Sequence, residues 1–399
     1  MNSSAPQTLT PAASVDFSRL TETPEFTLLL DTIRARKAEI HEKRHVPRDI
    51  VKLMKDARIF RSSTPLKFGG DCLPAHHFLK MVDKIGEVDG SAAWVAAFGS
   101  ANTYIAALPD EAQQVIYASG PDQVFAGGMY PLQKAERLDG GWKVSGQWKF
   151  ASGCKGADWI GVGLLGAGHA AGSDSSGAPV VKMAVAPAAE VEIIENWDVM
   201  GMQGSGSFDT TVKDKFYSDA WTFERGAQGI YDDPIYRYPA LAYQAQVHAA
   251  CNLGLARAAL DLAASMSGAA KIMPGATSLA ERGYFKSGLA DGEAKLRSAR
   301  AFFYEMAEQG WDELLVDGKV SEKTTNLMRL SASHAARAGG ETVEICFRIV
   351  GMGAVMESHP MQRYLRDSYV VRQHAALNDA TFENAGTLLA GLPAPAGFP

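Results

Sequence analysis

The stretch WKVSGQWKF, residues 142–150, indicates the fold class, because its apolar and polar side chains alternate along the chain. A two-residue period is typical of a β-strand with one buried face. Further short runs rich in Val, Ile and aromatic residues lie in the same region, separated by Gly, Asp and Ser, at 159–165, 180–186, 191–194 and 210–216. Strands of this length and spacing predict a β-barrel or sandwich.

Helical patterns lie on both sides of this β region. Before it, apolar residues recur at helical intervals in 26–43 and 47–57, and small and apolar residues fill 76–88 and 91–107. After it come long periodic segments with short Gly/Pro turns between them, at 240–267, 278–309, 322–350 and 363–390, which predict a four-helix bundle. We therefore expect an α+β protein with an N-terminal α-helical domain (16–122), a β-barrel or sandwich domain (123–230) and a C-terminal four-helix bundle domain (231–399).

The composition excludes several classes of protein. The chain of 399 residues is 46% hydrophobic and 21% charged, which is typical of a soluble globular protein of two or three domains. Its formal charge is −6 and it has no block of Lys and Arg, so it is not expected to bind nucleic acid. No apolar run is long enough for a membrane helix, and the N-terminus lacks the pattern of a signal peptide. The four cysteines lie far apart without CxxC spacing, which predicts reduced thiols in a cytoplasmic protein.

Two histidine motifs are weak candidates for metal ligands. Residues 41–45 (HEKRH) match the H-E-x-x-H motif of zinc proteases, in which both histidines share one helix face. Pro47 follows at once and no third ligand helix is evident, so we interpret the motif as a solvated, charged helix end. His76 and His77 stand beside a proline, and we interpret them as a surface or interface pair.

Two glycine motifs could bind a cofactor or could have a purely structural role. GMG at 351–353 lacks the third glycine of a dinucleotide-binding fingerprint and follows a helix rather than a strand. GSG at 204–206 lies between β-like segments. It is either an ordinary hairpin or a loop whose backbone N–H groups hold a flavin or a phosphate.

Five motifs in sequence order resemble the acyl-CoA dehydrogenase superfamily over nearly the whole chain. They are VPRDIVKLMKDA leading to FGG (46–70), DGSAAW (89–94), WKFASG leading to ADW (148–159), WDVMGMQGSGS (197–207), and GMG followed by HPMQRYLRD (351–367). The resemblance implies the fold of that family, with N-terminal helices, a central β-barrel and a C-terminal four-helix bundle. It also implies a homotetramer formed through the bundle, and the Ala- and Gly-rich segments there are compatible with this.

The resemblance further implies a flavin site. The matching positions are Trp148, Phe150, Ser152 and Gly153 on the strand beside the flavin ring, Gly204 and Ser205 in the later β loop, and Gly351, Gly353, Arg363, Arg366 and Asp367 near the last helices. The last group resembles the parts that meet the longer dinucleotide. Reduced FAD (FADH2) is therefore expected rather than FMN, which stays an alternative.

The catalytic base separates the branches of this family. Acyl-CoA dehydrogenases abstract an α-proton with a Glu shortly after the Arg-Asp pair, whereas the ionisable residue at that place here is His374. Some relatives carry the Glu on the first bundle helix, where this chain has Gln244. Without a carboxylate at either place, α-proton abstraction has no evident base.

A His at this place resembles instead the two-component flavin monooxygenases of the same fold. These enzymes receive reduced flavin from a separate NAD(P)H:flavin reductase, bind O2, and deliver oxygen from a C4a-hydroperoxyflavin to an aromatic or heteroatom substrate. The resemblance gives Ser152 a hydrogen bond to flavin N5, in a pocket that excludes water. We expect His374, titrating near neutrality, to supply or position the proton of the peroxide.

Departures from the phenol hydroxylases of this group narrow the substrate. Asn102 stands where those enzymes usually have His, and Gly127 or Gly128 where they usually have Ser. Losing both groups disfavours a phenol, whereas Asn102 can bond an N–H or a carbonyl and glycine leaves room for a larger ring. We therefore expect indole or indole-3-acetate to be hydroxylated or epoxidised. The candidate substrate-binding residues are Phe98, Asn102, Tyr104, Gly127 and Gly128.

Several alternatives stay open. The same chemistry could act on a phenol, an amino-sugar nitrogen or an aromatic sulfur. The chain could instead be a dehydrogenase with an unrecognised base, or a member of the fold that binds flavin or a partner without turnover. The sequence assigns no role to His248, nor to Gln203, which replaces an Arg of many relatives.

Overall fold

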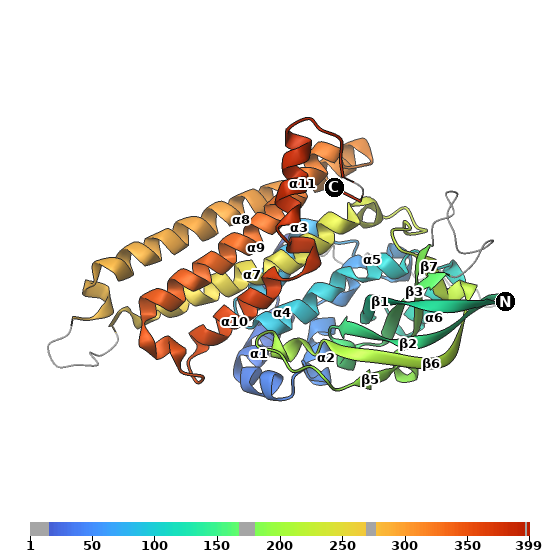
Figure 1. The fold of residues 1–399 in the computed structure, drawn as a ribbon, viewed down its shortest axis with the longest axis horizontal. Coiled ribbons are helices and arrows are strands. Elements are labelled where there is room, and N and C mark those ends of the chain that lie inside the picture. The colour runs from blue at the N-terminus through green and yellow to red at the C-terminus, as the bar shows by residue number, and fades with distance from the viewer. Residues whose placement is uncertain (1–15, 167–179, 269–276, 396) are drawn as a thin grey trace, which may run out of the picture.

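Helices, a β-sheet and helices again follow one another along the chain (Figure 1). The computed structural model describes residues 16–166, 180–268, 277–395 and 397–399. The α+β fold class predicted from the sequence is confirmed. The domain boundaries predicted at 122/123 and 230/231 stay predictions. They lie in the segment before the first strand and in the segment after the last one.

The N-terminal part is helical. Its α-helices are α1 (Pro24–Glu42), α2 (Arg48–Asp56), α3 (Ala75–Gly86), α4 (Gly90–Ala97), α5 (Asn102–Ile105) and α6 (Asp110–Ile116). Thr23 and Asp89 cap α1 and α4, because each side chain accepts a hydrogen bond from a backbone N–H of the first turn that has no partner within the helix.

The helix predicted over 91–107 is interrupted after α4, which corrects the prediction. A 3-10 turn at Phe98–Ser100 separates α4 from α5. The hydroxyls of Ser62 and Ser63 donate to the carbonyl of Gly99, at 3.2 and 2.6 Å. A Cβ on Gly99 would lie 2.3 Å from the backbone of the neighbouring segment. These contacts occupy the backbone at the point where the α-helix stops.

The central part is a seven-stranded sheet with the order β5-β6-β2-β1-β3-β4-β7. Its strands are β1 (Phe125–Leu138), β2 (Gly141–Ala151), β3 (Trp159–Gly166), β4 (Val181–Pro187), β5 (Glu192–Ile194), β6 (Phe208–Ser218) and β7 (Thr222–Glu224). β1 and β3 run parallel, and the other paired neighbours run antiparallel. The sequence pattern does not reveal β1, because Gly127, Gly128 and Pro131 interrupt its period of two.

The C-terminal part consists of α7 (Ala240–Ser265), α8 (Gly283–Asp317), α9 (Glu322–Val350), α10 (Pro360–Arg372) and α11 (Ala380–Leu389). α9 has the predicted bounds, but the helix predicted over 363–390 is divided in two. The chain turns at His374, whose side chain accepts a hydrogen bond from the N–H of Ala376 and so begins a separate 3-10 helix, Ala375–Leu377. α10 packs against α7 and α9, and α11 packs against α9 (Figure 1).

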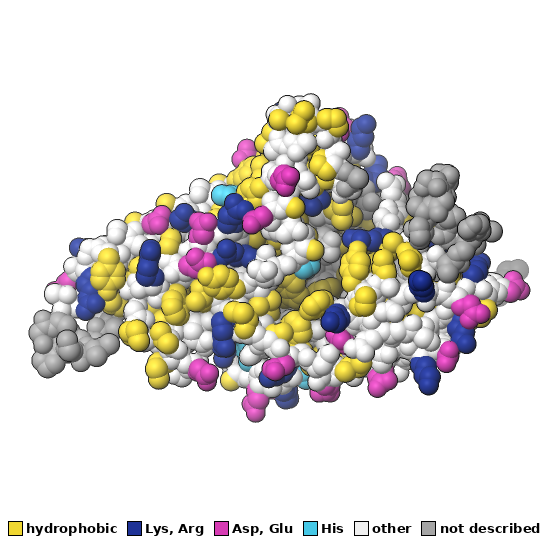
Figure 2. Space-filling view, in the orientation of Figure 1, with side chains coloured by type: hydrophobic (Ala, Val, Ile, Leu, Met, Phe, Trp, Pro, Cys, Tyr) yellow, Lys and Arg dark blue, Asp and Glu magenta, His cyan; other side chains and the backbone are white. Residues whose placement is uncertain are grey.

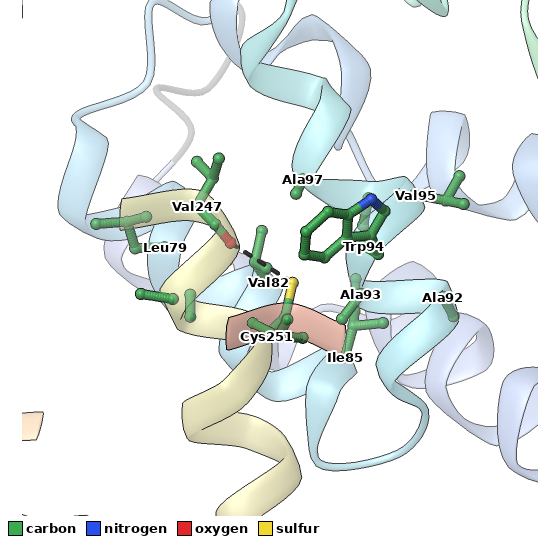
Figure 3. Packing of buried hydrophobic residues seen from close by; sticks show 14 of the residues in the cluster. Leu79, Val82, Ile85, Ala92, Ala93, Trp94, Val95, Ala97, Val247 and Cys251 are labelled. Atoms are coloured by element: carbon green, nitrogen blue, oxygen red, sulfur yellow. Dashed lines mark hydrogen bonds between the residues drawn. The ribbon is translucent and has the colours of Figure 1, made fainter. Parts of the chain in front are cut away.

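Two glycines bring the N-terminal helices into close contact with α7. A Cβ on Gly254 of α7 would lie 2.3 Å from the carbonyl oxygen of Asp83 and 2.6 Å from Cα of Gly86, both on α3. Glycine is therefore required for this approach. α4 follows α3 directly and also packs on α7. Figure 3 shows the result, with Trp94 of α4 near Cys251 of α7.

Within the described ranges, none of the helices combines the length and the hydropathy that a membrane span requires.

Candidate functional site

Aromatic rings meet where α4, α7 and the turn after α10 come together. The rings of His248 and His374 stack with centroids 4.1 Å apart and an angle of 15° between their planes. The indole of Trp94 lies edge-on to His248 at 4.3 Å and is 5.5 Å from His374. Phe98 approaches His248 at 6.3 Å. We call Trp94, Phe98, His248 and His374 the imidazole cluster.

The face of the molecule seen in Figure 2 is hollowed where the C-terminal helices meet the rest of the protein. Hydrophobic side chains and a histidine are visible at the rim of this hollow. His248 is buried, with 6% of its surface exposed, and His374 is partly buried.

Burial keeps both imidazoles uncharged. It lowers the pKa of His374 to about 4. It also holds the pKa of His248 well below the usual value, and the neighbouring His374 lowers it further. A neutral ring needs less solvation than an imidazolium, so both rings stay neutral at pH 7. The expectation that His374 titrates near neutrality is therefore wrong.

Hydrogen bonds to the backbone fix the tautomer of each ring. Nδ1 of His248 lies 2.6 Å from the carbonyl oxygen of Gln244, which can only accept, so Nδ1 carries the proton and Nε2 is a bare acceptor. Nδ1 of His374 lies 3.3 Å from the backbone nitrogen of Ala376, which can only donate, so the proton of the neutral ring is on Nε2. The stacked pair thus offers one acceptor and one donor without carrying charge.

A row of hydroxyls leads away from this cluster. The indole N–H of Trp94 donates to Oγ of Ser152 at 3.2 Å. Oγ of Ser207 lies 2.6 Å from Ser152 Oγ and 2.8 Å from Ser205 Oγ, and all three hydroxyls are buried. If the protons point from Ser205 towards Ser152, both lone pairs of Ser152 are used and its own O–H is free to donate. With the opposite order, Ser152 keeps a free lone pair and can accept.

Phe150, two residues before Ser152, presents its ring to the surface. The residue is 63% exposed and its ring lies edge-to-face with Trp197, with centroids 6.1 Å apart. Its φ of +63° is in the left-handed region, which is uncommon for an aromatic residue. The backbone conformation therefore interrupts the alternation of β2 at this point and leaves a flat aromatic surface beside Ser152.

Trp148, which we predicted to bind the cofactor, lies in the core of the sheet. Its side chain is fully buried, and its indole N–H donates to the carbonyl of Gly163 on β3 at 2.6 Å. The indole therefore presents no free surface to a ligand, and the assignment of Trp148 to the cofactor site stays a prediction. The alternation of β2 points this residue inwards.

The loop 200–207 is tied to helices on both sides. The N–H of Met202 donates to Asp367 of α10 at 2.5 Å, and the N–H of Gly204 donates to Ser91 Oγ of α4 at 3.1 Å. The N–H of Ser205 donates to the carbonyl of Met202 at 3.0 Å. Neither Gly204 nor Ser205 thus has a free backbone N–H, which disfavours the alternative that these groups hold a flavin or a phosphate, and the assignment of both residues to the cofactor site stays a prediction.

Asp367 and Gly153 complete the attachment of this loop. Burial raises the pKa of Asp367 to about 6. The N–H of Gly153 donates to the carbonyl of Ser205 at 2.8 Å. These two predicted cofactor-binding residues come together here, but they hold the loop in place rather than facing open space.

The remaining predicted cofactor residues lie at the other end of α10. Gly351 and Gly353 follow α9, and a Cβ on either would meet no atom within 4 Å. Arg363 and Arg366 are partly buried in the first half of α10. Nine residues separate Arg363 from the end of α10 at Arg372, which is about 14 Å along the axis. The structure does not bring this group together with the imidazole cluster.

The predicted substrate residues are only partly brought together. Phe98 belongs to the imidazole cluster. Asn102 is 1% exposed, and its amide nitrogen lies 2.9 Å from both the carbonyl oxygen of Phe60 and Oγ1 of Thr64. The amide N–H of Asn102 is therefore occupied within the protein, whereas its Oδ1 is buried without a hydrogen-bond partner among the described residues, so a bond from Asn102 to a substrate N–H stays a prediction. Tyr104 lies in α5, and burial raises the pKa of its hydroxyl to about 12.

Gly127 and Gly128 allow close strand packing. A Cβ on Gly127 would lie 2.8 Å from the carbonyl oxygen of Gly161 on β3, and a Cβ on Gly128 would lie 2.7 Å from Cβ of Trp148 on β2. The space next to these glycines is occupied by neighbouring strands. The interpretation that they make room for a larger substrate ring is wrong.

The H-E-x-x-H segment also differs from its interpretation. His41 is only 7% exposed, and its Nε2 lies 3.0 Å from a carboxylate oxygen of Asp89, the residue that caps α4. Nδ1 of His45 bonds to the carbonyl of Lys43 instead. His41 is thus buried and paired rather than solvated. In the part of the chain that the structure describes, no group of three His, Cys, Asp or Glu side chains could hold a metal ion.

Sequence reasoning missed two members of the imidazole cluster. The sequence places Trp94 only in a family motif and assigns no role to His248. One signal was available: His248 is the lone histidine in the buried, small-residue run HAACNLG of α7. An ionisable side chain among alanines is conspicuous, but its partner at position 374 is brought near only by the fold.

Comparison with known proteins gives consistent matches. A family model described as "Acyl-CoA dehydrogenase, C-terminal domain" matches residues 246–379. The chain is 41% identical to an indole-3-acetate monooxygenase of Pseudomonas putida, over 94% of this chain and 95% of the relative. It is 33% identical to an indole-3-acetate monooxygenase of Acinetobacter baumannii, over 96% of this chain and 98% of the relative.

Solved structures have the same fold. The 3-HSA hydroxylase of Rhodococcus sp. RHA1 superposes with a TM-score of 0.85 at 24% identity, covering 94% of this chain and 99% of the other. XiaF from Streptomyces sp., solved in complex with FADH2 and glycerol, gives a TM-score of 0.85 at 21% identity, covering 96% and 98% of the two chains.

Proposed function

The chain belongs to the flavin-dependent monooxygenase branch of the acyl-CoA dehydrogenase superfamily, and on that premise we propose that it oxygenates indole-3-acetate or a closely related indole. The predicted acyl-CoA dehydrogenase-like fold is confirmed by the structural likeness. The protein is the oxygenase component of a flavin-dependent system, which uses reduced flavin and O2 and implies a separate flavin reductase.

The neutral imidazole cluster is the observation that carries the proposal. Among the described residues, no carboxylate is hydrogen-bonded to His248, His374 or Trp94. An acyl-CoA dehydrogenase needs a carboxylate there as a general base. Uncharged rings with one N–H donor and one bare nitrogen are instead suited to holding a flat aromatic substrate and a proton in a dry site.

The residues present fit a flavin. The exposed ring of Phe150 offers a flat surface for stacking the isoalloxazine, and the partly buried Trp197 supports this ring edge-to-face. Ser152, two residues from Phe150, offers a hydroxyl that can donate or accept at a ring nitrogen. When bound and reduced, the flavin would supply the two electrons that activate O2, and O2 would supply the electrophilic oxygen atom for the substrate.

The chain's own groups have distinct proposed roles. Ser152 orients the flavin ring and is itself held by Trp94 and Ser207. His374 keeps a proton on Nε2 across the physiological pH range, because burial lowers its pKa to about 4. It can therefore donate a hydrogen bond to the reacting oxygen without becoming cationic. Trp94 and Phe98 exclude water from this region.

Further parts of the proposal concern assembly. We propose FAD as the flavin and a homotetramer formed through the C-terminal helices. We also propose a cytoplasmic location, where an NAD(P)H-dependent reductase can deliver reduced flavin.

A coupled oxygen-uptake assay tests this function. The protein is mixed with a generic flavin reductase, NADH and FAD, and each of indole, indole-3-acetate and 4-hydroxyphenylacetate is added in turn. We expect indole-3-acetate to be converted to an oxygenated product with little H2O2. Formation of H2O2 alone with every aromatic would overturn the proposal, and reduction of the bound flavin by an acyl-CoA would favour the dehydrogenase.

A further inference from the structure

His248 carries the acceptor of the imidazole cluster. Its Nδ1 proton is committed to the carbonyl of Gln244 at 2.6 Å, so in the neutral ring only Nε2 is left for another partner. Within residues 16–166, 180–268, 277–395 and 397–399, this Nε2 has no hydrogen-bond partner. The ring of His248 is only 6% exposed, yet Nε2 is not fully enclosed by protein atoms, so a bound molecule can reach it and place a donor there.

The surroundings of His248 determine what kind of molecule can supply that donor. The ring is bounded by the indole edge of Trp94 at 4.3 Å, by Phe98 at 6.3 Å and by the stacked ring of His374 at 4.1 Å. Such walls favour a flat aromatic molecule over a flexible polar one. The donor is then expected to be an N–H or O–H attached directly to an aromatic ring.

The neighbouring imidazole cannot take over this role. Nδ1 of His374 already accepts from the N–H of Ala376 at 3.3 Å, so the neutral ring presents an N–H at Nε2. Two donors facing each other do not bond. A ring N–H of a substrate is therefore matched by His248 and not by His374.

We propose that His248 determines substrate specificity by accepting a hydrogen bond from the ring N–H of the indole, which orients the substrate in the site. This inference rests on the proposed function for its choice of substrate. As the indole attacks an electrophilic oxygen, positive charge develops on its ring nitrogen, and the N–H donates more strongly. The contact with Nε2 therefore strengthens as the reaction proceeds. Aromatic sulfur heterocycles, which have no ring N–H, lack this contact.

Binding measurements can test the contact separately from turnover. We would load the protein with oxidised FAD, which does not activate O2, and measure by calorimetry the Kd of indole-3-acetate and of benzofuran-3-acetate. The second ligand has the same shape, with a ring oxygen in place of N–H. One hydrogen bond to Nε2 of His248 predicts that wild type binds the indole about tenfold more tightly than the benzofuran.

The variants then locate the effect. In His248→Phe, both ligands should bind with nearly equal Kd, because the acceptor is gone. His248→Gln, whose amide oxygen can accept, should recover part of the preference. Phe98→Leu is the matched control, since it changes an aromatic wall but leaves the acceptor, and it should weaken both ligands while the preference stays near tenfold.

Two outcomes would overturn the inference: a wild-type preference close to onefold, or an unchanged preference in His248→Phe. If that variant does not fold, the wild-type ratio and His248→Gln still decide. The oxygen-uptake assay keeps the two hypotheses apart. If the protein oxygenates indole-3-acetate but binds it no more tightly than benzofuran-3-acetate, only the role of His248 is contradicted. If the protein binds indole-3-acetate about tenfold more tightly than benzofuran-3-acetate but forms no oxygenated product, only the proposed function is contradicted.

Discussion

The imidazole cluster and the loop 200–207 lie on two sides of Ser152 and are held by different kinds of interaction. The cluster consists of neutral rings whose orientation is fixed by stacking and by single bonds to the backbone. The loop is attached through directional bonds from its N–H groups to Ser91 and to the buried Asp367. The comparison indicates that the proposed substrate side is kept uncharged, whereas the proposed flavin side is kept rigid.

Removing the N–H donor of His374 from the imidazole cluster should have the largest effect on the coupling of O2 consumption to product formation. In His374→Ala, oxygenated product per O2 consumed is expected to fall about 100-fold, the size typical of losing a positioned proton donor. Flavin oxidation should continue and yield H2O2, which a peroxidase assay measures. His374→Asn keeps a side-chain N–H and should recover part of the coupling. Unchanged coupling in the alanine variant would refute the role of His374.

A substitution at Asp367, which holds the loop 200–207, should change the stability of the fold rather than the coupling. Asp367→Ala leaves the N–H of Met202 buried without an acceptor and should lower the free energy of unfolding by about 1–3 kcal/mol. Asp367→Asn retains an acceptor oxygen and should lose less. Urea unfolding measures both. Equal midpoints for wild type and Asp367→Ala would show that the carboxylate does not hold the loop.

A smaller effect is expected where the flavin would stack. Phe150→Ala should raise the Kd for FAD by up to about tenfold, because one aromatic contact is lost. Phe216→Ala is the matched control, since Phe216 is a half-exposed phenylalanine on β6. Fluorescence titration of FAD gives both values, and equal affinity in the two variants would place the flavin elsewhere.

The smallest effect concerns pH. The pKa of His374 is lowered from 6.5 to about 4 by burial, so coupling should be flat between pH 6 and 8 and show no step near 6.5. Between pH 6.5 and 4 the unfolded chain binds a proton at this residue while the folded protein does not. This residue therefore makes stability fall as the pH decreases through that window. A step in coupling near pH 6.5 that disappears in His374→Asn would contradict the neutral ring.

The sequence predicts features that depend on local patterns, but not features that depend on contacts between distant segments. Strand β2 was expected at 142–150 and is found at Gly141–Ala151, and the bounds of α9 agree with prediction, because both patterns are local. The burial of Trp148 follows from the alternation of β2, whereas the family motif assigns this residue to the cofactor. The imidazole cluster could not be predicted, since it depends on the close contact of Gly86 with Gly254 and on the turn at His374.

The pKa of His374 could not be predicted from the sequence either. Its value depends on burial among side chains from α4 and α7, which are distant in the chain. The same holds for Asn102, whose amide nitrogen is occupied by contacts with Phe60 and Thr64. Residue type predicted what these groups can do, and the fold decides which partners they meet.

The fate of molecular oxygen tests the central claim most directly. Indole-3-acetate would be incubated with the protein, reduced FAD supplied by a reductase, and ¹⁸O2, and the product analysed by mass spectrometry. We expect one ¹⁸O atom in the product and the second in water. A product without ¹⁸O, or no oxygenated product while ¹⁸O2 is converted to peroxide, would contradict the assignment of this site to oxygen transfer.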